Sequence, residues 1–207
     1  MITELFSNPL SFLIWLVALL VALTIHEFSH AAMADRLGDP TARLAGRKTL
    51  NPFAHLDPIG TLMLLFFRVG WGKPVPIDDY NLQDSRRDTA LISLAGPGSN
   101  LILAIFLAIL MRLIGLIGLI GPMIILNVSL GIFNLLPIHP LDGAKILLGF
   151  LDDEQAYKLE VFYRQFGLIL LIFLLFPFFG TSPIMAVIWP IINFIIRILV
   201  PGGTTII

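Results

Sequence analysis

The first hydrophobic run of the chain constrains the fold most, because it is long enough to cross a lipid bilayer. It extends from Leu10 to about Ala34 and opens with LSFLIWLVALLVALTI. A transmembrane helix needs about 20 mainly apolar residues to cross a hydrocarbon core of roughly 30 Å. The flank Met1–Pro9 holds no Lys or Arg, and the run exceeds the apolar region of a signal peptide, so we expect it to be retained. The run predicts a transmembrane helix.

Further apolar runs indicate a chain that enters the membrane several times. They cover about Thr89–Met111, Gly121–Leu136, Gly167–Phe179 and Ile184–Leu199. A shorter run, Ile59–Val69, cannot span and is typical of a re-entrant or half-buried hairpin. Of the 207 residues 57% are hydrophobic and only 13% are charged, whereas soluble domains carry about 25% charged residues. We predict an all-α polytopic integral membrane protein with five or six membrane elements, including the short re-entrant segment.

The polar segment Gly70–Asp88 contains GWGKPVPID, in which prolines occupy alternate positions. This pattern excludes a helix and suits an edge strand. We therefore predict a small extended, β-like segment near residues 70–79. Either it is a plain connector, or it pairs with an extended substrate. The residues that would form such a pairing strand are Lys73, Pro74, Val75, Pro76 and Ile77.

The distribution of basic residues predicts the orientation, because cytoplasmic loops collect Lys and Arg. With the N-terminus outside, most of them fall at the inner side: Arg36, Arg43, Arg47, Lys48, Lys73, Arg86, Arg87, Lys145, Lys158, Arg164 and Arg197. Arg112 falls at the outer side, and Arg68 lies in the short apolar run. We predict a multi-pass protein of the cell membrane with its N-terminus outside and its C-terminus in the cytoplasm.

Ionisable residues interrupt the first apolar run as His26-Glu27-Phe28-Ser29-His30. Such groups are costly inside a membrane and are functional candidates by default. Residues four apart project from one helix face, so both imidazoles can reach one Zn²⁺ ion. Glu27 lies beside them and can accept a proton from zinc-bound water. Since Leu10 to Ile25 covers about 24 Å of helix, the site is predicted in the cytoplasmic third of the bilayer. A pair of core histidines satisfied by hydrogen bonds is the alternative.

A catalytic zinc site needs a third protein ligand and one open position. The residues directly after His30 offer no further histidine. Asp142 follows an apolar run within NLLPIHPLDG, the segment Asn134–Gly143, whose prolines allow the chain to unwind beside a cavity. A carboxylate returning to the depth of the two histidines would complete a His₂Asp site with one Zn²⁺ per chain.

Together, HEFSH and NLLPIHPLDG resemble the site-2 proteases of peptidase family M50, intramembrane zinc metalloproteases that cut substrates within or near their membrane segments. RKTLNPFAHLDPIGTLM, GWGKPVPID and LAGPGSN support the resemblance and occur in the family's order, over roughly residues 20–150. The resemblance implies zinc ligands at His26, His30 and Asp142, and a catalytic base at Glu27. It also implies that Asn134 helps to hold the substrate or the developing oxyanion. The implied partners are the lipid bilayer and a membrane-protein or membrane-peptide substrate.

The resemblance predicts one membrane-embedded peptidase domain over residues 1–207, with a catalytic core of about 10–150 and further membrane helices at about 165–200. The chain leaves no room for an inserted PDZ domain after His30 and few residues after Leu199, so we expect a short form without PDZ or nucleotide-binding modules. There is no cysteine, which excludes disulfides and a cysteine nucleophile. The net charge of -1 gives no indication of a nucleic-acid partner.

A polytopic metal or ion transporter with a midplane His/Glu/Asp site is the second hypothesis. It would favour inverted repeats and polar residues along a path, and neither is evident. Four polar residues keep open roles. His55 and Asp57 fit either turn chemistry or contacts to a ligand. Asn100 fits either a close helix approach or an active-site contact. His139 fits packing of its loop. The substrate and the oligomeric state are not evident from the sequence.

Overall fold

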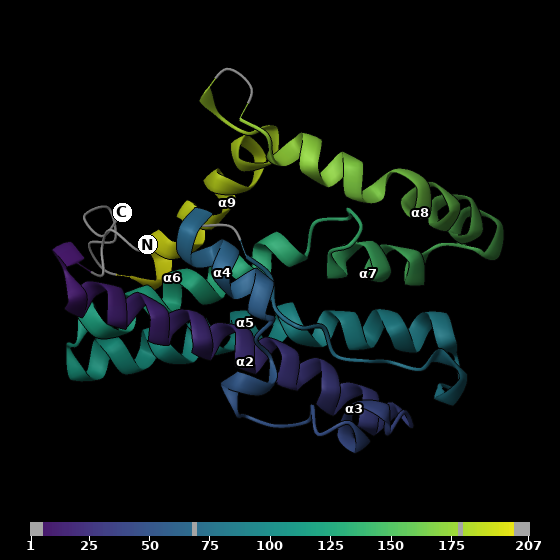
Figure 1. Cartoon of the computed structure of the whole chain (residues 1–207), viewed down its shortest axis with the longest axis horizontal. Coiled ribbons are helices and arrows are strands. Elements are labelled where there is room, and N and C mark those ends of the chain that lie inside the picture. Colours follow the sequence, from purple (N-terminus) through teal and green to yellow (C-terminus); the bar gives the residue numbers. More distant parts are fainter. Residues whose placement is uncertain (1–5, 68–69, 178–179, 201–207) are drawn as a thin grey trace.

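Three helices form the centre of the molecule. The computed structural model describes residues 6–67, 70–177 and 180–200. Within them, the helices long and apolar enough to cross a membrane are α2 (Pro9–Leu37), α5 (Ser85–Ile114) and α6 (Ile117–Asn134). They lie side by side in Figure 1, and α5 contacts both of the others. The described residues form no sheet, so the predicted all-α membrane class is confirmed.

Capping residues set the ends of these helices. The Asn8 side chain accepts a hydrogen bond from the Ser11 amide before α2, and Gly38 ends that helix in the left-handed conformation with φ 109°. Asp84 caps α5 in the same way as Asn8, and Gly115, at φ 72°, ends it. Both helices therefore extend a few residues beyond the apolar runs that predicted them.

The segment between α2 and α5 carries short elements. They are α3 (Thr41–Leu44), η1 (Pro52–Ala54), α4 (Pro58–Phe67) and η2 (Asp79–Asn81). The helix α4 coincides with the predicted re-entrant run, whose last residues lie outside the described ones. In the predicted extended segment, an isolated bridge joins Leu56 to Gly72, and the Lys73 amide donates to the His55 carbonyl at 2.8 Å. No described residue of this segment belongs to a regular strand.

The C-terminal part begins with α7 (Asp142–Phe150), followed by α8 (Asp153–Leu175) and α9 (Pro183–Leu199). The polar stretch before the apolar run at Gly167 forms the first half of α8, which Asp152 caps. Along the direction of the bundle, α8 and α9 follow one another (Figure 1). Isoleucines of α9 complete a buried core with α5 and α6, as Ile188, Ile192 and Ile196 are almost fully buried.

One contact contradicts the predicted separation of Arg112 and Arg197. Arg112 near the end of α5 donates to the Ile198 carbonyl at 2.7 Å, so the end of α9 lies beside the end of α5. Arg197 is therefore at the same end of the bundle as Arg112, not with the basic residues near His30. The predicted orientation, with the N-terminus outside and the C-terminus in the cytoplasm, placed Arg197 at the inner side with those residues. Residues 201–207 lie outside the described ones.

Candidate metal centre

The two histidines of α2 face one another inside the bundle. His26 and His30 are 4% and 7% exposed, and their Nε2 atoms lie 3.0 Å apart. Asp142, the first residue of α7, brings its Oδ2 atom to 3.1 Å from His26 Nε2 and 3.3 Å from His30 Nε2. The structure thus gathers the three side chains that the sequence predicted as zinc ligands.

Helix α5 holds both imidazoles from behind. His30 Nδ1 lies 2.7 Å from the Ile92 carbonyl oxygen, and His26 Nδ1 lies 2.7 Å from Asn100 Oδ1. Ile92 and Asn100 lie about two turns apart on α5. The later histidine contacts the earlier of the two, as expected for antiparallel helices. A carbonyl oxygen can only accept, so both Nδ1 atoms donate, and a neutral ring then carries its lone pair on Nε2. Both lone pairs face the carboxylate.

Between these two contacts, α5 has a glycine where a side chain would fill the site. A Cβ atom on Gly96 would lie 2.3 Å from His30 Nε2 and 2.8 Å from His26 Cε1. Real Cβ atoms do not approach that closely, and the nearest atoms belong to rings that are already held. Gly96 therefore keeps open the space in front of the two nitrogen atoms.

The loop that delivers Asp142 is fixed by packing. A Cβ atom on Gly143 would lie 2.3 Å from the carbonyl oxygens of Leu135 and Leu136, so only glycine fits this turn. The Tyr163 hydroxyl of α8 donates to the Pro137 carbonyl at 2.7 Å. His139 stacks on the same tyrosine ring, with centroids 6.3 Å apart, and packs against Gly167. His139 is thus a packing residue of the loop, as expected.

The three side chains fit a divalent metal such as Zn²⁺. Their ligand atoms are acceptors at mutual distances of 3.0, 3.1 and 3.3 Å, and Asp142 Oδ2 is buried without a hydrogen-bond partner among the described residues. Three acceptors this close repel one another unless a cation lies between them. In a tetrahedral zinc site with bonds near 2.05 Å, ligand atoms lie about 3.3 Å apart. The donor set and its spacing match such a site.

Glu27 and Asn134 are half-buried. Glu27 projects from α2 beside the first ligand, and its carboxylate has no hydrogen-bond or ion-pair partner within the described part of the chain. Asn134 ends α6 and donates from Nδ2 to the Leu130 carbonyl at 3.0 Å. Its side-chain oxygen and second amide hydrogen stay available for another partner.

The predicted pairing segment is anchored at its beginning. Arg47, which is 7% exposed, donates to the carbonyl oxygens of Lys73 and Pro74. His55 is fully buried, and its Nε2 donates to the Thr49 carbonyl at 2.8 Å. His55 therefore has a structural role in the turn rather than a contact to the metal ligands.

Two further carboxylates lie outside the metal group. Asp57 accepts a hydrogen bond from the Gly60 amide at 2.7 Å at the start of α4, so it too has a structural role in a turn. Asp39, which sequence reasoning missed, is fully buried just after α2 and accepts hydrogen bonds from Thr41, the Asp78 amide and Asn81. Asp39 thus ties the end of the pairing segment to α2.

Charge and burial shift the pKa of two groups that lie outside the spanning helices. Burial, with a smaller contribution from the Lys145 ammonium, lowers the pKa of His139, which is therefore neutral at pH 7. Burial opposes ionisation of Asp39, but hydrogen bonds from Thr41, the Asp78 amide and Asn81 outweigh it and lower the pKa of that carboxyl. Asp39 is thus an anion that its neighbours stabilise.

Sequence reasoning also missed Asn127, on α6. It is fully buried, and its Oδ1 atom accepts a hydrogen bond from Asn100 Nδ2 at 2.8 Å. The signal was present, because an amide side chain in the middle of an apolar run needs a partner in the membrane. Without knowledge of which helices are neighbours, that partner could not be identified.

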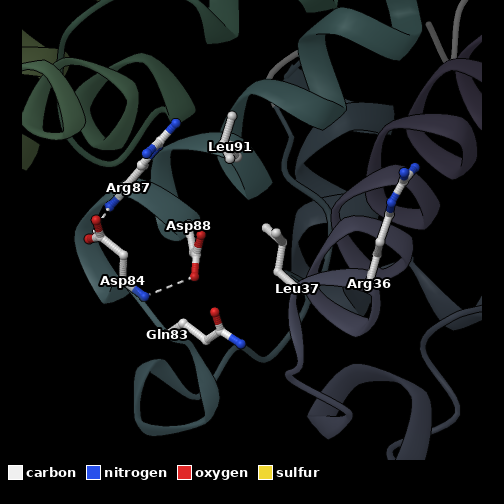
Figure 2. Close-up of a pocket in the computed structure, with 7 residues that line it drawn as sticks. All are labelled: Arg36, Leu37, Gln83, Asp84, Arg87, Asp88 and Leu91. Atoms are coloured by element: carbon white, nitrogen blue, oxygen red, sulfur yellow. Dashed lines mark hydrogen bonds between the residues drawn. The ribbon is translucent and has the colours of Figure 1, made fainter.

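A pocket of about 390 Å³ lies at another place, between the end of α2 and the start of α5. Its lining residues are Arg36, Leu37, Gln83, Asp84, Arg87, Asp88 and Leu91. In Figure 2 the guanidinium groups of Arg36 and Arg87 extend away from Asp88, whose carboxylate accepts a hydrogen bond from the Asp84 amide at 3.1 Å. None of these residues belongs to the metal group, so this pocket is a separate feature of the bundle end.

A bundle of apolar helices around a buried His₂Asp group is the arrangement expected of a membrane-embedded metallopeptidase, and comparison with known proteins agrees. The family model described as Peptidase family M50 matches residues 14–119 and 112–177. The chain belongs to this family, which confirms the family predicted from its motifs. No solved structure matches the chain.

Several curated proteins are similar to the chain. "Putative zinc metalloprotease YwhC" of Bacillus subtilis is 38% identical over 199 residues, covering 89% of each chain. "Putative zinc metalloprotease Rip2" of Mycolicibacterium smegmatis is 33% identical over 81% of this chain and 70% of its own length. "Zinc metalloprotease MJ0392" of Methanocaldococcus jannaschii is 25% identical over 85% of this chain and 50% of its own. Similarity to YwhC thus extends over nearly the whole of both proteins.

Proposed function

We propose that this chain is an intramembrane zinc metalloprotease that hydrolyses peptide bonds in or near the transmembrane segments of its substrates. The observation that carries the proposal is the convergence of His26, His30 and Asp142 on one point, with the unpaired carboxylate of Glu27 on the same helix as both histidines. Membership of a peptidase family and similarity to proteins named zinc metalloproteases favour this function over ion transport. The substrates are membrane proteins or membrane peptides, cleaved for signalling or for clearance.

The roles of the residues follow from their chemistry. His26, His30 and Asp142 would hold one Zn²⁺ ion. The ion supplies a Lewis acid that activates water near neutral pH and polarises the scissile carbonyl. Glu27 accepts a proton from the attacking water as the oxygen bonds to the carbonyl carbon. When the carbon–nitrogen bond breaks, Glu27 returns that proton to the leaving amine. The Asn134 amide donates to the developing oxyanion, where loss of one donor typically costs about 2.7–4 kcal/mol.

Substrate binding is assigned to the segment from Lys73 to Ile77. A transmembrane helix must unwind before hydrolysis, because its peptide groups are already hydrogen-bonded to one another. In an extended chain, alternate residues direct their backbone groups to the same edge. Lys73 uses its amide to bind His55, whereas the backbone groups of Val75 and Ile77 have no hydrogen-bond partner among the described residues. Since the intervening prolines lack an amide hydrogen, only this edge can form a ladder with a substrate.

The proposed location is the cell membrane, with the N-terminus outside and the metal centre in the inner third. Most basic residues outside the apolar runs cluster at the His30 end of the bundle, including Arg36, Arg43 and Lys48. Arg112 and Arg197 lie at the opposite end. This asymmetry supports a cytoplasmic position for the end that carries the metal centre.

Replacement of Glu27 tests the proposed reaction. Glu27→Gln keeps all three ligands but cannot accept a proton, so we expect the purified protein to retain one zinc per chain and to lose hydrolysis by at least about 10²-fold. The matched control is Glu154→Gln, an exposed carboxylate of α8. Cleavage of a labelled transmembrane peptide in detergent and zinc content are measured on both variants. Unchanged cleavage by Glu27→Gln would contradict the assigned role.

A proline substitution tests the pairing segment. Val75→Pro removes an amide hydrogen from the free edge while retaining an extended backbone, and Val75→Ala changes only the side chain. We expect Val75→Pro to raise KM for the transmembrane peptide with little change in zinc content, and Val75→Ala to bind like the unaltered protein. Equal KM values for the two variants would assign Lys73–Ile77 a connecting role only.

A further inference from the structure

A chain of buried hydrogen bonds links α6 to the first histidine. Asn127 Nδ2 donates to the Met123 carbonyl at 2.8 Å, and Asn127 Oδ1 accepts from Asn100 Nδ2 at 2.8 Å. Asn100 Nδ2 also lies 2.9 Å from the Ala22 carbonyl, and Asn100 Oδ1 lies 2.7 Å from His26 Nδ1. Both asparagines are 0% exposed. Three spanning helices thus meet in one polar network.

The order of donors and acceptors in this network has one solution. The Met123 carbonyl can only accept, so the amide nitrogen of Asn127 faces it and the oxygen faces Asn100. The Asn127 oxygen and the Ala22 carbonyl oxygen both need a donor, so the side-chain nitrogen of Asn100 faces them. The oxygen of Asn100 is then left for His26, whose Nδ1 must carry the proton.

We propose that Asn127 is a positioning residue for the metal centre: acting through Asn100, it holds the His26 imidazole with its Nε2 lone pair facing His30 and Asp142. This inference rests on the proposed metal-binding function. The opposite tautomer would place a hydrogen on Nε2, inside the group of acceptors where the ion belongs. A partner that fixes the tautomer of a ligating histidine typically changes metal affinity about 10–100-fold.

The network differs from ordinary polar contact between membrane helices. In the observed orientation, the Asn100 nitrogen faces the Ala22 carbonyl and the Asn100 oxygen faces His26. A flipped amide would direct its oxygen at the Ala22 carbonyl and its nitrogen at His26. Asn127 adds a second acceptor on the Ala22 side, because a flipped Asn100 would also direct its oxygen at the Asn127 oxygen. Two facing acceptors without a hydrogen between them are unfavourable in a buried site. Asn127 therefore reinforces the orientation of Asn100 that the Ala22 carbonyl favours.

The test uses the full chain purified in detergent, with Zn²⁺ affinity measured by competition with chelators of graded strength. Asn127→Leu removes the acceptor, and we expect about tenfold weaker zinc binding, the lower end of the range for direct partners. We also expect an altered visible absorption spectrum of the Co²⁺-loaded protein, which reports the ligand geometry. Asn127→Asp keeps an oxygen facing Asn100, and in its neutral, protonated form its second oxygen can still donate to the Met123 carbonyl. This variant should restore affinity and spectrum.

A packing control separates positioning from stability. Val128→Ala removes buried contacts from the same turn of α6, so we expect a lower unfolding temperature with unchanged zinc affinity and Co²⁺ spectrum. If Asn127→Leu does not fold, Asn127→Ser serves instead, since its hydroxyl bonds to its own helix and is too short to reach Asn100. The inference would be overturned if Asn127→Leu, or Asn127→Ser in its place, bound zinc as tightly as the unaltered protein. It would also be overturned if Asn127→Asp bound zinc as weakly as Asn127→Leu. Absence of zinc from the unaltered protein would instead contradict the proposed function.

Discussion

The histidine half and the aspartate half of the metal centre are held in different ways. His26 and His30 project from consecutive turns of α2, and each is bound through Nδ1 by a group on α5. Asp142 instead begins α7, which packs on α5, and follows a loop. Gly143, the Tyr163 hydroxyl of α8 and packing of Leu141 against α8 and α9 hold that loop in place. Helix α8 itself packs mainly on α7 and α9 rather than on the central bundle.

This difference predicts how each half of the metal centre responds when the metal is removed or a residue is replaced. Side chains on two packed spanning helices keep their relative positions, because both helices are fixed over many turns. A loop opens locally at lower free energy than packed spanning helices do. We therefore expect the histidine half to persist without metal, and the aspartate half to depend on the metal and on α8.

We expect the largest effect when a side chain fills the space in front of the two histidine nitrogens while all three ligands are kept. The methyl group of Gly96→Ala would lie 2.3 Å from His30 Nε2, so we expect loss of both zinc binding and peptide cleavage. The matched control is Gly98→Ala on the same helix, because a Cβ atom there meets nothing within 4 Å. Zinc content and cleavage are compared after purification. Full zinc occupancy in Gly96→Ala would contradict the assigned position of the ion.

Removal of the aspartate tests the loop half directly. Asp142→Ala leaves two imidazoles, so zinc affinity should fall by more than about 100-fold and cleavage should be lost. His139→Ala changes the same loop but removes only packing on Gly167 and Tyr163, and should retain most zinc and activity. If Asp142→Ala kept its zinc while His139→Ala lost it, the third ligand would be His139.

Metal removal should affect the two halves unequally. In the chelated protein, we expect faster hydrogen exchange at the amides of residues 136–143, with little change around Asn100 and His26. Once the cation is gone, the Nε2 lone pairs of His26 and His30 repel the Asp142 carboxylate, while α5 still binds both imidazole rings. Exchange is measured by mass spectrometry with and without Zn²⁺. Equal acceleration in both regions would remove the distinction between them.

The same difference explains what the sequence could predict. The histidine pair was predictable, since four-residue spacing on one helix fixes both positions locally. Asp142 was identified as a ligand only because its proline-broken segment offered a carboxylate after an apolar run, together with the family resemblance. Gly96, Asn127 and the Ile92 carbonyl were not identified, because their roles depend on which faces of α2, α5 and α6 meet.

The fold was predictable to a similar extent. Long apolar runs gave the three spanning helices, with ends that caps such as Asn8 and Gly38 extended. The first half of α8 was missed because its residues are polar, although a helix outside the apolar layer needs no hydrophobic run. The position of Arg197 was misassigned because hydropathy does not reveal that α8 and α9 follow one another along one path.

Asp39, which follows the end of α2, predicts how the stability of the protein changes at acidic pH. The pKa of Asp39 lies below its ordinary value of about 3.9, so its ionised form stabilises the fold above about pH 4. This contribution is lost as the pH falls through the lowered pKa. We expect Asp39→Asn to destabilise the protein by about 1.5–3 kcal/mol at pH 7, and the difference from the unaltered protein to narrow below pH 4. Thermal unfolding at several pH values measures it, with the exposed Asp153→Asn as control. A difference that is the same at pH 3 and pH 7 would contradict the assigned ionisation.

The smallest expected effect tests the contact between α8 and the loop of the aspartate half. Tyr163→Phe removes the hydroxyl that donates to the Pro137 carbonyl at 2.7 Å, a loss of about 0.5–1.5 kcal/mol. Because the ring remains, His139 keeps its stacking partner, and Asp142 should only become more mobile. We therefore expect a few-fold weaker zinc binding and faster exchange in residues 136–143, with unchanged protection around His26. Tyr157→Phe, 69% exposed on the same helix, should change neither. Slower exchange in the loop of Tyr163→Phe would mean that the hydroxyl strains the loop instead of holding it.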